Sequence, residues 1–388
     1  MNLDFSDAQN EIRDAILKLC EQFPDSYWLD CDRQKSFPHE FHRTLAEAGW
    51  LGIAMPEEFG GAGLGITEAA VMMQAIAECG AGMTGASSVH MNIFGLEPVV
   101  LFGTPAQQRR MLPGIITGKD KACFAVTEPN VGLNTTQLKV RAEKRPGGYL
   151  VNGEKIWIST AQVASRMLLL ARTTPLDRIA RKTDGLSLFY TDLDRARIEV
   201  REIEKMGRHG VDSNLLFIED LWVPDEDLIG AEGDGFRIIL HGLNPERILI
   251  AAEAVGLGRA AIRKAADYAR ERIVFDRPIG QNQGIQHPLA KCWAQLEAAN
   301  LMVLKAARLF DQGKDCGVEA NTAKYLAGEF AFEACHTAML TLGGMGYAQE
   351  YHIERYLRES LIPRIAPVSP HMILNFLAEN VLGLPKSY

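Results

Sequence analysis

A carboxylate interrupts an apolar stripe in the stretch from residue 236 to residue 250. Ile239, Leu243, Glu246 and Ile250 are spaced by four, three and four residues, which places them on one face of an α-helix. A carboxylate surrounded by buried hydrocarbon favours its neutral form. Its pKa should therefore be raised, as the pKa of a general base at neutral pH must be.

The stripe by itself leaves two interpretations of Glu246 open. The glutamate is either a catalytic base or a structural residue at the rim of a core. In the second case its partner would be Arg247, another neighbour, or Arg263, because structural ion pairs also perturb carboxylates. The remaining sequence has to separate these two interpretations.

Composition excludes several classes of protein. The chain has 388 residues, of which 47% are hydrophobic and 23% charged, with a formal net charge of −8. These values are typical of a globular protein of two or three domains. The negative charge argues against a nucleic acid or an anionic membrane as partner. The chain contains no apolar run of the roughly 18 residues that a membrane span requires.

The cysteines and the N-terminal residues favour a cytoplasmic location. Seven cysteines, an odd number with no Cys-x-x-Cys pair, are typical of reduced packing thiols rather than of disulfides or a metal site. The first residues, Met-Asn-Leu-Asp-Phe-Ser-Asp, contain acidic side chains and no basic or Arg-rich leader. We therefore expect a cytoplasmic protein without a bound metal.

The periodicity of the sequence predicts an α+β protein of three domains. Residues 1–120 are expected to be all-helical, beginning with a capping box at Ser6 and Gln9. Residues 121–233 change to a period of two and predict a small antiparallel β-barrel or sandwich. Residues 234–388 predict an antiparallel four-helix bundle.

Shorter patterns predict individual elements within these domains. Helices are expected in the first domain around residues 38–49, 67–80 and 105–117. Asn152-Gly153 is expected to form a hairpin turn, because both residues tolerate positive φ. Six strands are expected in all, over residues 122–127, 148–159, 165–172, 186–192, 198–204 and 213–224. The four helices of the bundle are expected over residues 235–272, 283–312, 317–343 and 349–382.

Several motifs in this order resemble the acyl-CoA dehydrogenase family of flavoenzymes, and the likeness covers nearly the whole chain. The resemblance rests on these segments: Cys123-Phe-Ala-Val-Thr-Glu-Pro-Asn-Val-Gly132, Tyr149-Leu-Val-Asn-Gly-Glu-Lys-Ile-Trp-Ile-Ser159, Glu204-Lys-Met-Gly207, Phe217-Ile-Glu-Asp-Leu-Trp-Val-Pro224, Glu271-Arg-Ile-Val-Phe275 and Leu342-Gly-Gly-Met-Gly-Tyr347. Each segment alone has an ordinary structural meaning. Their combination implies the family's helical, β-barrel and helical-bundle domains.

The resemblance implies a site for FAD. Phe124, Val126 and Thr127 match the strand beside the flavin ring, and Trp157 and Ser159 match an aromatic cover and a hydroxyl that meets flavin N5. A donor at N5 polarises the atom that accepts the hydride.

Further cofactor contacts are implied from another subunit. Arg272 matches an arginine that reaches the FAD pyrophosphate, for which a planar guanidinium is well suited. The other implied cofactor contacts are Phe275, Gln283, Gly343, Gly344 and Ser369. A cofactor held by two chains implies a homodimer or homotetramer.

The likeness also supports Glu246 as the base. Most of the family carries this glutamate in a turn near the C-terminus, where the present chain has Pro367. The isovaleryl-CoA and long-chain branches instead carry it on the first bundle helix, just before an arginine, as Glu246-Arg247 does. The absence of a carboxylate at 367 and its presence at 246 therefore explain one another.

The residues expected to contact the acyl-CoA substrate are Leu133, Asn244, Arg247 and Val368. Two of these neighbourhoods depart from the family pattern. Leu133 replaces a serine, and Pro367 lacks the N–H that donates to the thioester oxygen in similar enzymes. Asn244-Pro245 allows either a kink in the helix or a helix start, with Asn244 as N-cap.

The reaction that the resemblance implies is FAD-dependent α,β-dehydrogenation of an acyl-CoA thioester to a trans-2-enoyl-CoA, as in fatty acid or branched-chain acyl metabolism and β-oxidation. Glu246 would be the base, flavin N5 the hydride acceptor, and an electron-transfer flavoprotein the next acceptor. Two alternatives remain. One is a flavin oxidase, monooxygenase or lyase of the same fold that acts on an unusual acyl-CoA. The other is a non-catalytic binding relative.

Overall fold

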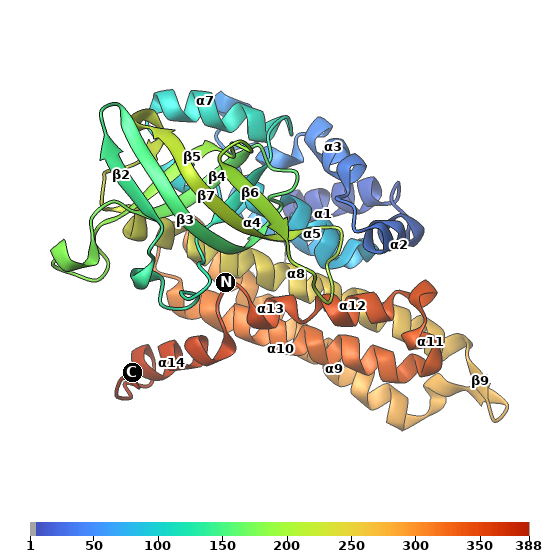
Figure 1. Cartoon of the computed structure of the whole chain (residues 1–388). Coiled ribbons are helices and arrows are strands. Elements are labelled where there is room, and N and C mark those ends of the chain that lie inside the picture. The colour runs from blue at the N-terminus through green and yellow to red at the C-terminus, as the bar shows by residue number, and fades with distance from the viewer. Residues whose placement is uncertain (1–4, 388) are drawn as a thin grey trace.

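The chain folds into N-terminal helices, a central β-sheet and a C-terminal set of long helices (Figure 1). This computed structural model describes residues 5–387. Residues 1–4 and 388, which belong to the predicted first and third domains, lie outside it. The sheet lies on one side of the long helices, and the N-terminal helices lie beside it. The fold class inferred from the sequence is confirmed in outline.

The N-terminal region contains seven α-helices, which are α1 (Asp7–Cys20), α2 (Asp25–Gln34), α3 (His39–Glu47), α4 (Ile66–Ile76), α5 (Gly82–Phe94), α6 (Glu97–Phe102) and α7 (Pro105–Ile116). The predicted capping box is confirmed, because the Ser6 hydroxyl accepts from Gln9 N and the Gln9 side chain accepts from Ser6 N. The expected runs correspond to α3, α4 and α7. The sequence analysis did not define α2, α5 or α6.

The central region forms one eight-stranded sheet. Its strands are β1 (Ala122–Ala125), β2 (Arg141–Arg145), β3 (Gly148–Ser159), β4 (Arg166–Arg172), β5 (Leu186–Asp192), β6 (Ile198–Glu202), β7 (Ser213–Pro224) and β8 (Leu228–Ile229). The strand order is β6-β7-β3-β2-β4-β5-β8, and β1 pairs with β4. Successive residues of β4 enter different cores: Leu168 packs towards the helices and Leu169 into the sheet's own interior.

Two expectations for the sheet were wrong, and two of its strands, β2 and β8, were not predicted. The sheet is not entirely antiparallel, because β1 runs parallel to β4. Asn152-Gly153 is not a hairpin turn. It lies inside β3, at a register shift against β7 where Gly153 adopts φ 141°, so a β-bulge uses the same tolerance that a turn would. The actual turn joins the missed strand β2 to β3, where Gly147 adopts φ 86°.

The C-terminal region begins with three long helices, α8 (Gly235–Glu271), α9 (Gln283–Asp311) and α10 (Gly317–Leu342), as predicted. Between α8 and α9 lies a hairpin of β9 (Ile273–Val274) and β10 (Arg277–Pro278). Pro245 lies inside α8, and Asp234 is the N-cap. The alternative in which Asn244 caps a new helix is therefore wrong.

The fourth long helix, expected over residues 349–382, is not formed. The chain instead makes four short helices after α10: α11 (Gly344–Tyr347), α12 (Ile353–Glu359), α13 (Ile362–Ile365) and α14 (Pro370–Asn380). His352 adopts a left-handed conformation before α12. Pro363 and Pro370 each lie in the first turn of a new helix, where the missing N–H is tolerated.

The N-terminal and C-terminal helices share one hydrophobic core. This core joins Ile16 of α1 and Met73 of α4 to Leu249 of α8 and Ala327 of α10. Asp311 at the end of α9 also caps α4, accepting from Ile66 N at 2.8 Å and Thr67 N at 2.9 Å. The two helical regions are therefore one packed unit against which the sheet is placed.

Candidate active site

Glu246 lies in the first half of α8, and one oxygen of its carboxylate is buried. Its side chain is half-buried, and Oε2 is buried without a hydrogen-bond partner among the described residues. Burial raises the pKa of Glu246 to about 7, although the nearby His90 and Arg247 oppose that rise. The carboxyl group can therefore take up a proton near neutral pH.

Among the described residues, neither Arg247 nor Arg263 forms the structural ion pair with Glu246 that the sequence pattern left open. Arg263 donates instead to the Glu78 carbonyl at 2.6 Å. Arg247 donates to the Asn244 side chain at 3.0 Å, and its Nε, like Oε2 of Glu246, is a buried atom that has no partner in the described part of the chain. Buried polar atoms without partners are rare in folded proteins. Two of them in adjacent side chains indicate a place where a ligand binds.

The C-terminal turn approaches the same place through Lys324 of α10. Lys324 donates to the Val368 carbonyl at 2.5 Å, and its charge acts on Glu246. Lys324 therefore interacts with both Val368, a predicted substrate contact, and Glu246, the predicted base. The Ser369 hydroxyl accepts from Met372 N as the N-cap of α14.

A buried lysine holds the end of β1 against β3. Lys155 Nζ donates to the Val126 carbonyl and the Leu170 carbonyl, both at 2.8 Å, and to Glu128 at 3.1 Å. The Thr127 carbonyl accepts from Ile156 N at 2.9 Å. Val126 and Thr127 are therefore placed directly beside the strand segment that carries Trp157.

Trp157 and Ser159 occupy the irregular end of β3. Trp157 adopts φ 61° at a register shift and leaves 56% of its surface exposed. Exposure of so large an apolar side chain is typical of a binding surface. Ser159 is half-buried, and its hydroxyl accepts from Arg208 at 2.9 Å. Phe124 packs where the core of the helices meets the core beneath the sheet.

The other predicted cofactor residues lie elsewhere. Arg272, Gln283, Gly343 and Gly344 are exposed, and Phe275 is 93% exposed. They belong to the β9–β10 hairpin and its surroundings and to the start of α11, at the end of the long helices away from the sheet (Figure 1). Within one chain they do not join Trp157 and Ser159. Leu133 lies in a loop after β1 and is 57% exposed.

Three charged residues of this site were not predicted from the sequence. Glu253 of α8 forms a short ion pair with His90 of α5. Arg208, from the loop between β6 and β7, donates to Ser87 at 3.2 Å as well as to Ser159. Glu253 had a detectable signal, because it continues the stripe of Glu246 and Ile250 by another three residues. His90 and Arg208 had none.

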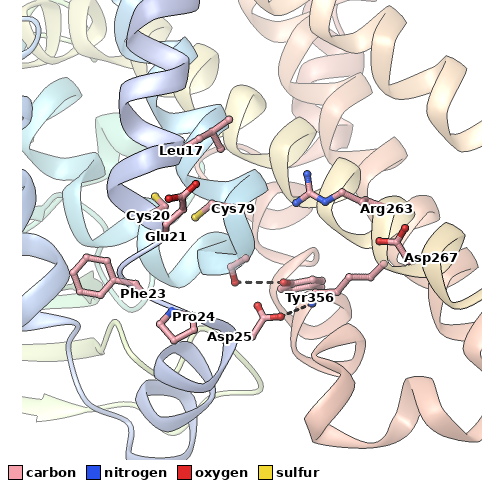
Figure 2. Close-up of a pocket in the computed structure, with 12 residues that line it drawn as sticks. Leu17, Cys20, Glu21, Phe23, Pro24, Asp25, Cys79, Arg263, Asp267 and Tyr356 are labelled. Carbon is pink, nitrogen blue, oxygen red and sulfur yellow. Dashed lines mark hydrogen bonds and ion pairs between the residues drawn. The ribbon is translucent and has the colours of Figure 1, made fainter.

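A well-formed cavity lies apart from this cluster. It has a volume of about 350 Å³, and residues of α1, α2, α8 and α12 line it, among them Cys20, Asp25, Arg263 and Tyr356 (Figure 2). A smaller cavity of about 250 Å³ lies beside Glu128 and Pro129. Neither contains Glu246, Trp157 or Ser159. The candidate site is instead marked by Glu246 Oε2 and Arg247 Nε, which are buried without partners among the described residues, and by the exposed ring of Trp157. Such groups can bind a ligand.

Two kinds of feature are not found. No group of three or more histidine, cysteine, aspartate or glutamate side chains within residues 5–387 is arranged to hold a metal ion. Over the same residues, no helix combines the length and the apolar character needed to cross a membrane.

Comparison with protein families gives matches along almost the entire chain. The acyl-CoA dehydrogenase N-terminal domain matches residues 6–119, the middle domain residues 123–221 and the C-terminal domain residues 233–382. Among curated proteins, the acyl-CoA dehydrogenase FadE12 of Mycobacterium tuberculosis is 35% identical over 390 residues, covering 99% of this chain and 98% of the relative.

Solved structures agree with this. The structure of a glutaryl-coenzyme A dehydrogenase with glutaryl-CoA superimposes with a TM-score of 0.94 at 29% identity, covering 100% of this chain and 98% of the other. The FAD complex of PigA superimposes with a TM-score of 0.93 at 26% identity, covering 99% of this chain and 100% of the other. On the strength of all three domains and the full-length relative, the chain belongs to the acyl-CoA dehydrogenase family of flavoprotein oxidoreductases.

Proposed function

We propose that this protein catalyses the α,β-dehydrogenation of an acyl-CoA thioester to a trans-2-enoyl-CoA, with Glu246 as the base. One observation carries the proposal. Glu246 presents a buried carboxylate oxygen that has no hydrogen-bond partner among residues 5–387, on a helix that borders the sheet, and burial raises the pKa of Glu246 to about 7. A base with this pKa can remove an acidic C–H proton at neutral pH.

The residues at the end of β3 and around the end of β1 fit FAD. Trp157 offers an exposed aromatic face beside Val126 and Thr127, and the Ser159 hydroxyl lies next to the Arg208 guanidinium. When bound, FAD supplies the two-electron acceptor that the substrate's β C–H bond requires. Phe124, Val126, Thr127, Trp157 and Ser159 would hold its ring from this chain.

The protein's own residues then have distinct tasks. Glu246 takes the proton from the carbon next to the thioester carbonyl, and the buried surroundings exclude water from that proton. Arg247 and Lys324 lower the pKa of Glu246 and so keep part of it ionised. Pro367 has no N–H to offer the thioester oxygen, and Lys324 already holds the Val368 carbonyl. We infer that the polarising donor comes from elsewhere in this turn.

The decisive experiment replaces Glu246 by glutamine. Glu246→Gln keeps the shape of the side chain but cannot accept the proton, so bound FAD should remain oxidised when acyl-CoA is added without oxygen. We expect reduction to slow by a factor of at least about 10². The measurement is the absorbance of the flavin in anaerobic stopped-flow experiments.

A matched control is Glu199→Gln on β6, where the side chain is 62% exposed. This variant should reduce its flavin at the rate of the unmodified protein. Flavin reduction at an undiminished rate in Glu246→Gln would show that the base is another residue.

We further propose a homodimer or homotetramer in which Arg272, Phe275, Gln283, Gly343 and Gly344 contact the FAD of a second subunit. The support is their exposure at the end of the long helices away from the sheet. An electron-transfer flavoprotein is the proposed acceptor of the electrons. Rapid reoxidation of the reduced protein by air, with peroxide as product, would instead identify an oxidase of the same fold.

A further inference from the structure

A second set of charged side chains lies within reach of Glu246 and has no task in the proposed reaction. Ser87 and His90 are three residues apart on α5 and therefore share a face. Glu253 lies two turns beyond Glu246 on α8 and pairs with His90. Arg208 reaches Ser87 from the sheet side. Helix α5, helix α8 and the sheet thus contribute polar groups to one cluster.

In the proposed reaction the acyl chain would lie between the base and the cofactor, and the contacts of this cluster connect the two. His90 acts electrostatically on Glu246, and Glu253 on Arg208. Arg208 also donates to Ser159, the hydroxyl assigned to the cofactor. The polar groups therefore extend from the base to the cofactor side. A purely hydrocarbon chain would offer no acceptor to the buried Nε of Arg208, which has no partner among residues 5–387, and this costs free energy.

Arg208 is the charged residue of the cluster that forms no ion pair within the described part of the chain. Its three hydrogen bonds all go to serine hydroxyls, those of Ser87, Ser159 and Ser213, at 3.2, 2.9 and 3.3 Å. Its Nε is buried and has no partner among residues 5–387. Neutral hydroxyls satisfy N–H groups but do not compensate the charge.

The carboxylates nearest to Arg208 are all occupied by other groups. Glu253 is paired with His90. Glu359 accepts from Met83 N at 2.6 Å and from the Thr84 hydroxyl at 2.7 Å. Asp212 accepts from Gln162 N at 3.0 Å. Within the described part of the chain, no carboxylate oxygen lies within the 4.0 Å of an ion pair with Arg208.

Among the residues that the structure describes, Arg208 has carboxylates only beyond ion-pair distance. Glu253, Glu359 and Asp212 act on its guanidinium electrostatically, but among residues 5–387 none of them forms an ion pair with it. A carboxylate from a ligand can bind the guanidinium directly, with two parallel hydrogen bonds.

We infer that the acyl group accepted by this site ends in a carboxylate, which binds to Arg208. The substrate class is therefore a short ω-carboxyacyl-CoA rather than a plain fatty acyl-CoA. This inference rests on the proposed function, because it places the acyl chain between Glu246 and FAD. Ser87 and the His90–Glu253 pair position the guanidinium and line the path of the chain.

The test compares thioesters of equal chain length on the FAD-loaded protein. Glutaryl-CoA is paired with pentanoyl-CoA, adipyl-CoA with hexanoyl-CoA, and 5-hydroxypentanoyl-CoA serves as an uncharged polar ligand. Calorimetric titration of Glu246→Gln measures binding without turnover, so the result does not depend on the identity of the base. We expect a carboxyacyl-CoA to bind on the order of 30-fold tighter than its unsubstituted counterpart.

Arg208→Met should remove this preference, because the side chain keeps its length and loses its charge. The matched control is Arg181→Met, an arginine on another loop of the sheet whose side chain is 81% exposed; it should keep the preference. If Arg208→Met fails to fold or to retain FAD, the ligand series on the unmodified and Glu246→Gln proteins still decides.

Three results overturn the inference while leaving the proposed function intact. The first is flavin reduction in which pentanoyl-CoA and hexanoyl-CoA bind as tightly as, or more tightly than, their carboxyacyl counterparts. The second is equal binding of 5-hydroxypentanoyl-CoA and glutaryl-CoA. The third is an unchanged preference in Arg208→Met. The proposed function itself fails in a different way: no thioester of either class would reduce the flavin of the unmodified protein.

Discussion

At the scale of the residue, Glu246 shows how burial prepares a carboxylate for proton transfer. The neighbouring cations His90, Arg247 and Lys324 each favour the ionised form, yet burial outweighs them and raises the pKa of Glu246 to about 7. The carboxyl group is therefore held between its two protonation states at neutral pH. A base in this condition accepts a proton readily and releases it again.

The first consequence is a pH dependence of flavin reduction. Only ionised Glu246 can accept the substrate proton, so the rate should rise with pH up to about 7 and level off above it. Below that value the rate should fall roughly tenfold per pH unit. Single-turnover reduction between pH 5 and pH 9 measures this profile. A rate that stays constant down to pH 5 would contradict the role of Glu246.

The second consequence is a gain of stability in Glu246→Gln. The pKa of the folded protein lies above that of the unfolded chain, so ionisation of Glu246 destabilises the fold increasingly as pH rises from about 4.5 to 7. Glutamine removes this cost. At pH 8 the FAD-free variant should gain roughly 1–3 kcal/mol in free energy of unfolding, and the gain should disappear near pH 4. Urea unfolding at both pH values measures it.

At the scale of the element, the site is held by the meeting of strands and helices rather than by any one of them. The end of β1 is fixed to β3 by Lys155, which is fully buried and has three acceptors. Helix α8 contributes Glu246 and Glu253 from one face, and α5 contributes His90. Each of these side chains gains its environment from an element far away in the sequence.

Lys155→Met should therefore loosen the cofactor side of the site. It leaves Glu128 buried without its charged partner and leaves the Val126 carbonyl without its donor. Breaking a buried pair of this kind costs about 3–5 kcal/mol. We expect a lower melting temperature and loss of FAD during gel filtration. Lys139→Met, at an exposed lysine nearby, is the control and should retain both.

The elements that could be predicted from the sequence are those with local signals. The capping box of α1 and the long apolar runs of α8, α9 and α10 are encoded in neighbouring residues, and these were correctly identified. Asn152-Gly153 was predicted to be a hairpin turn but forms a bulge, because both structures need the same backbone freedom. The prediction of a fourth long helix was wrong, because Pro363 and Pro370 each lie in the first turn of a new short helix.

The site shows the same division. Glu246 could be singled out because a carboxylate within an apolar stripe is a local anomaly. His90 and Arg208 could not, since their roles arise only when α5 and the loop after β6 are brought to α8. The cofactor residues were assigned by resemblance, and the structure describes only one chain. Their contacts to a second subunit therefore remain a prediction.

At the scale of the whole molecule, the predicted cofactor residues fall into two groups at separate places on the chain. One group lies at the ends of strands β1 and β3. The other lies at the far end of the long helices, with Phe275 almost fully exposed. An exposed phenylalanine and exposed glycines at the same end of the long helices suit contact with another copy of the chain. One complete site would then need two chains.

Mixing two inactive variants tests this arrangement. Glu246→Gln lacks the base, and Arg272→Ala lacks the proposed contact to the partner's cofactor. Co-expression should restore activity, because a site with Glu246 from one chain and Arg272 from the other is intact in the mixed oligomer. The activity of the purified, doubly tagged mixture measures it. No restoration would mean that Arg272 serves the site of its own chain.

The hydrophobic core shared by both ends of the chain has a consequence for biosynthesis. Ile16 and Met73 leave the ribosome before Leu249 and Ala327, their packing partners, have been translated. The apolar faces of the early helices must therefore stay exposed while the sheet is synthesised. Chaperone protection during that interval, rather than the strength of the finished fold, should limit the yield of this protein in cells.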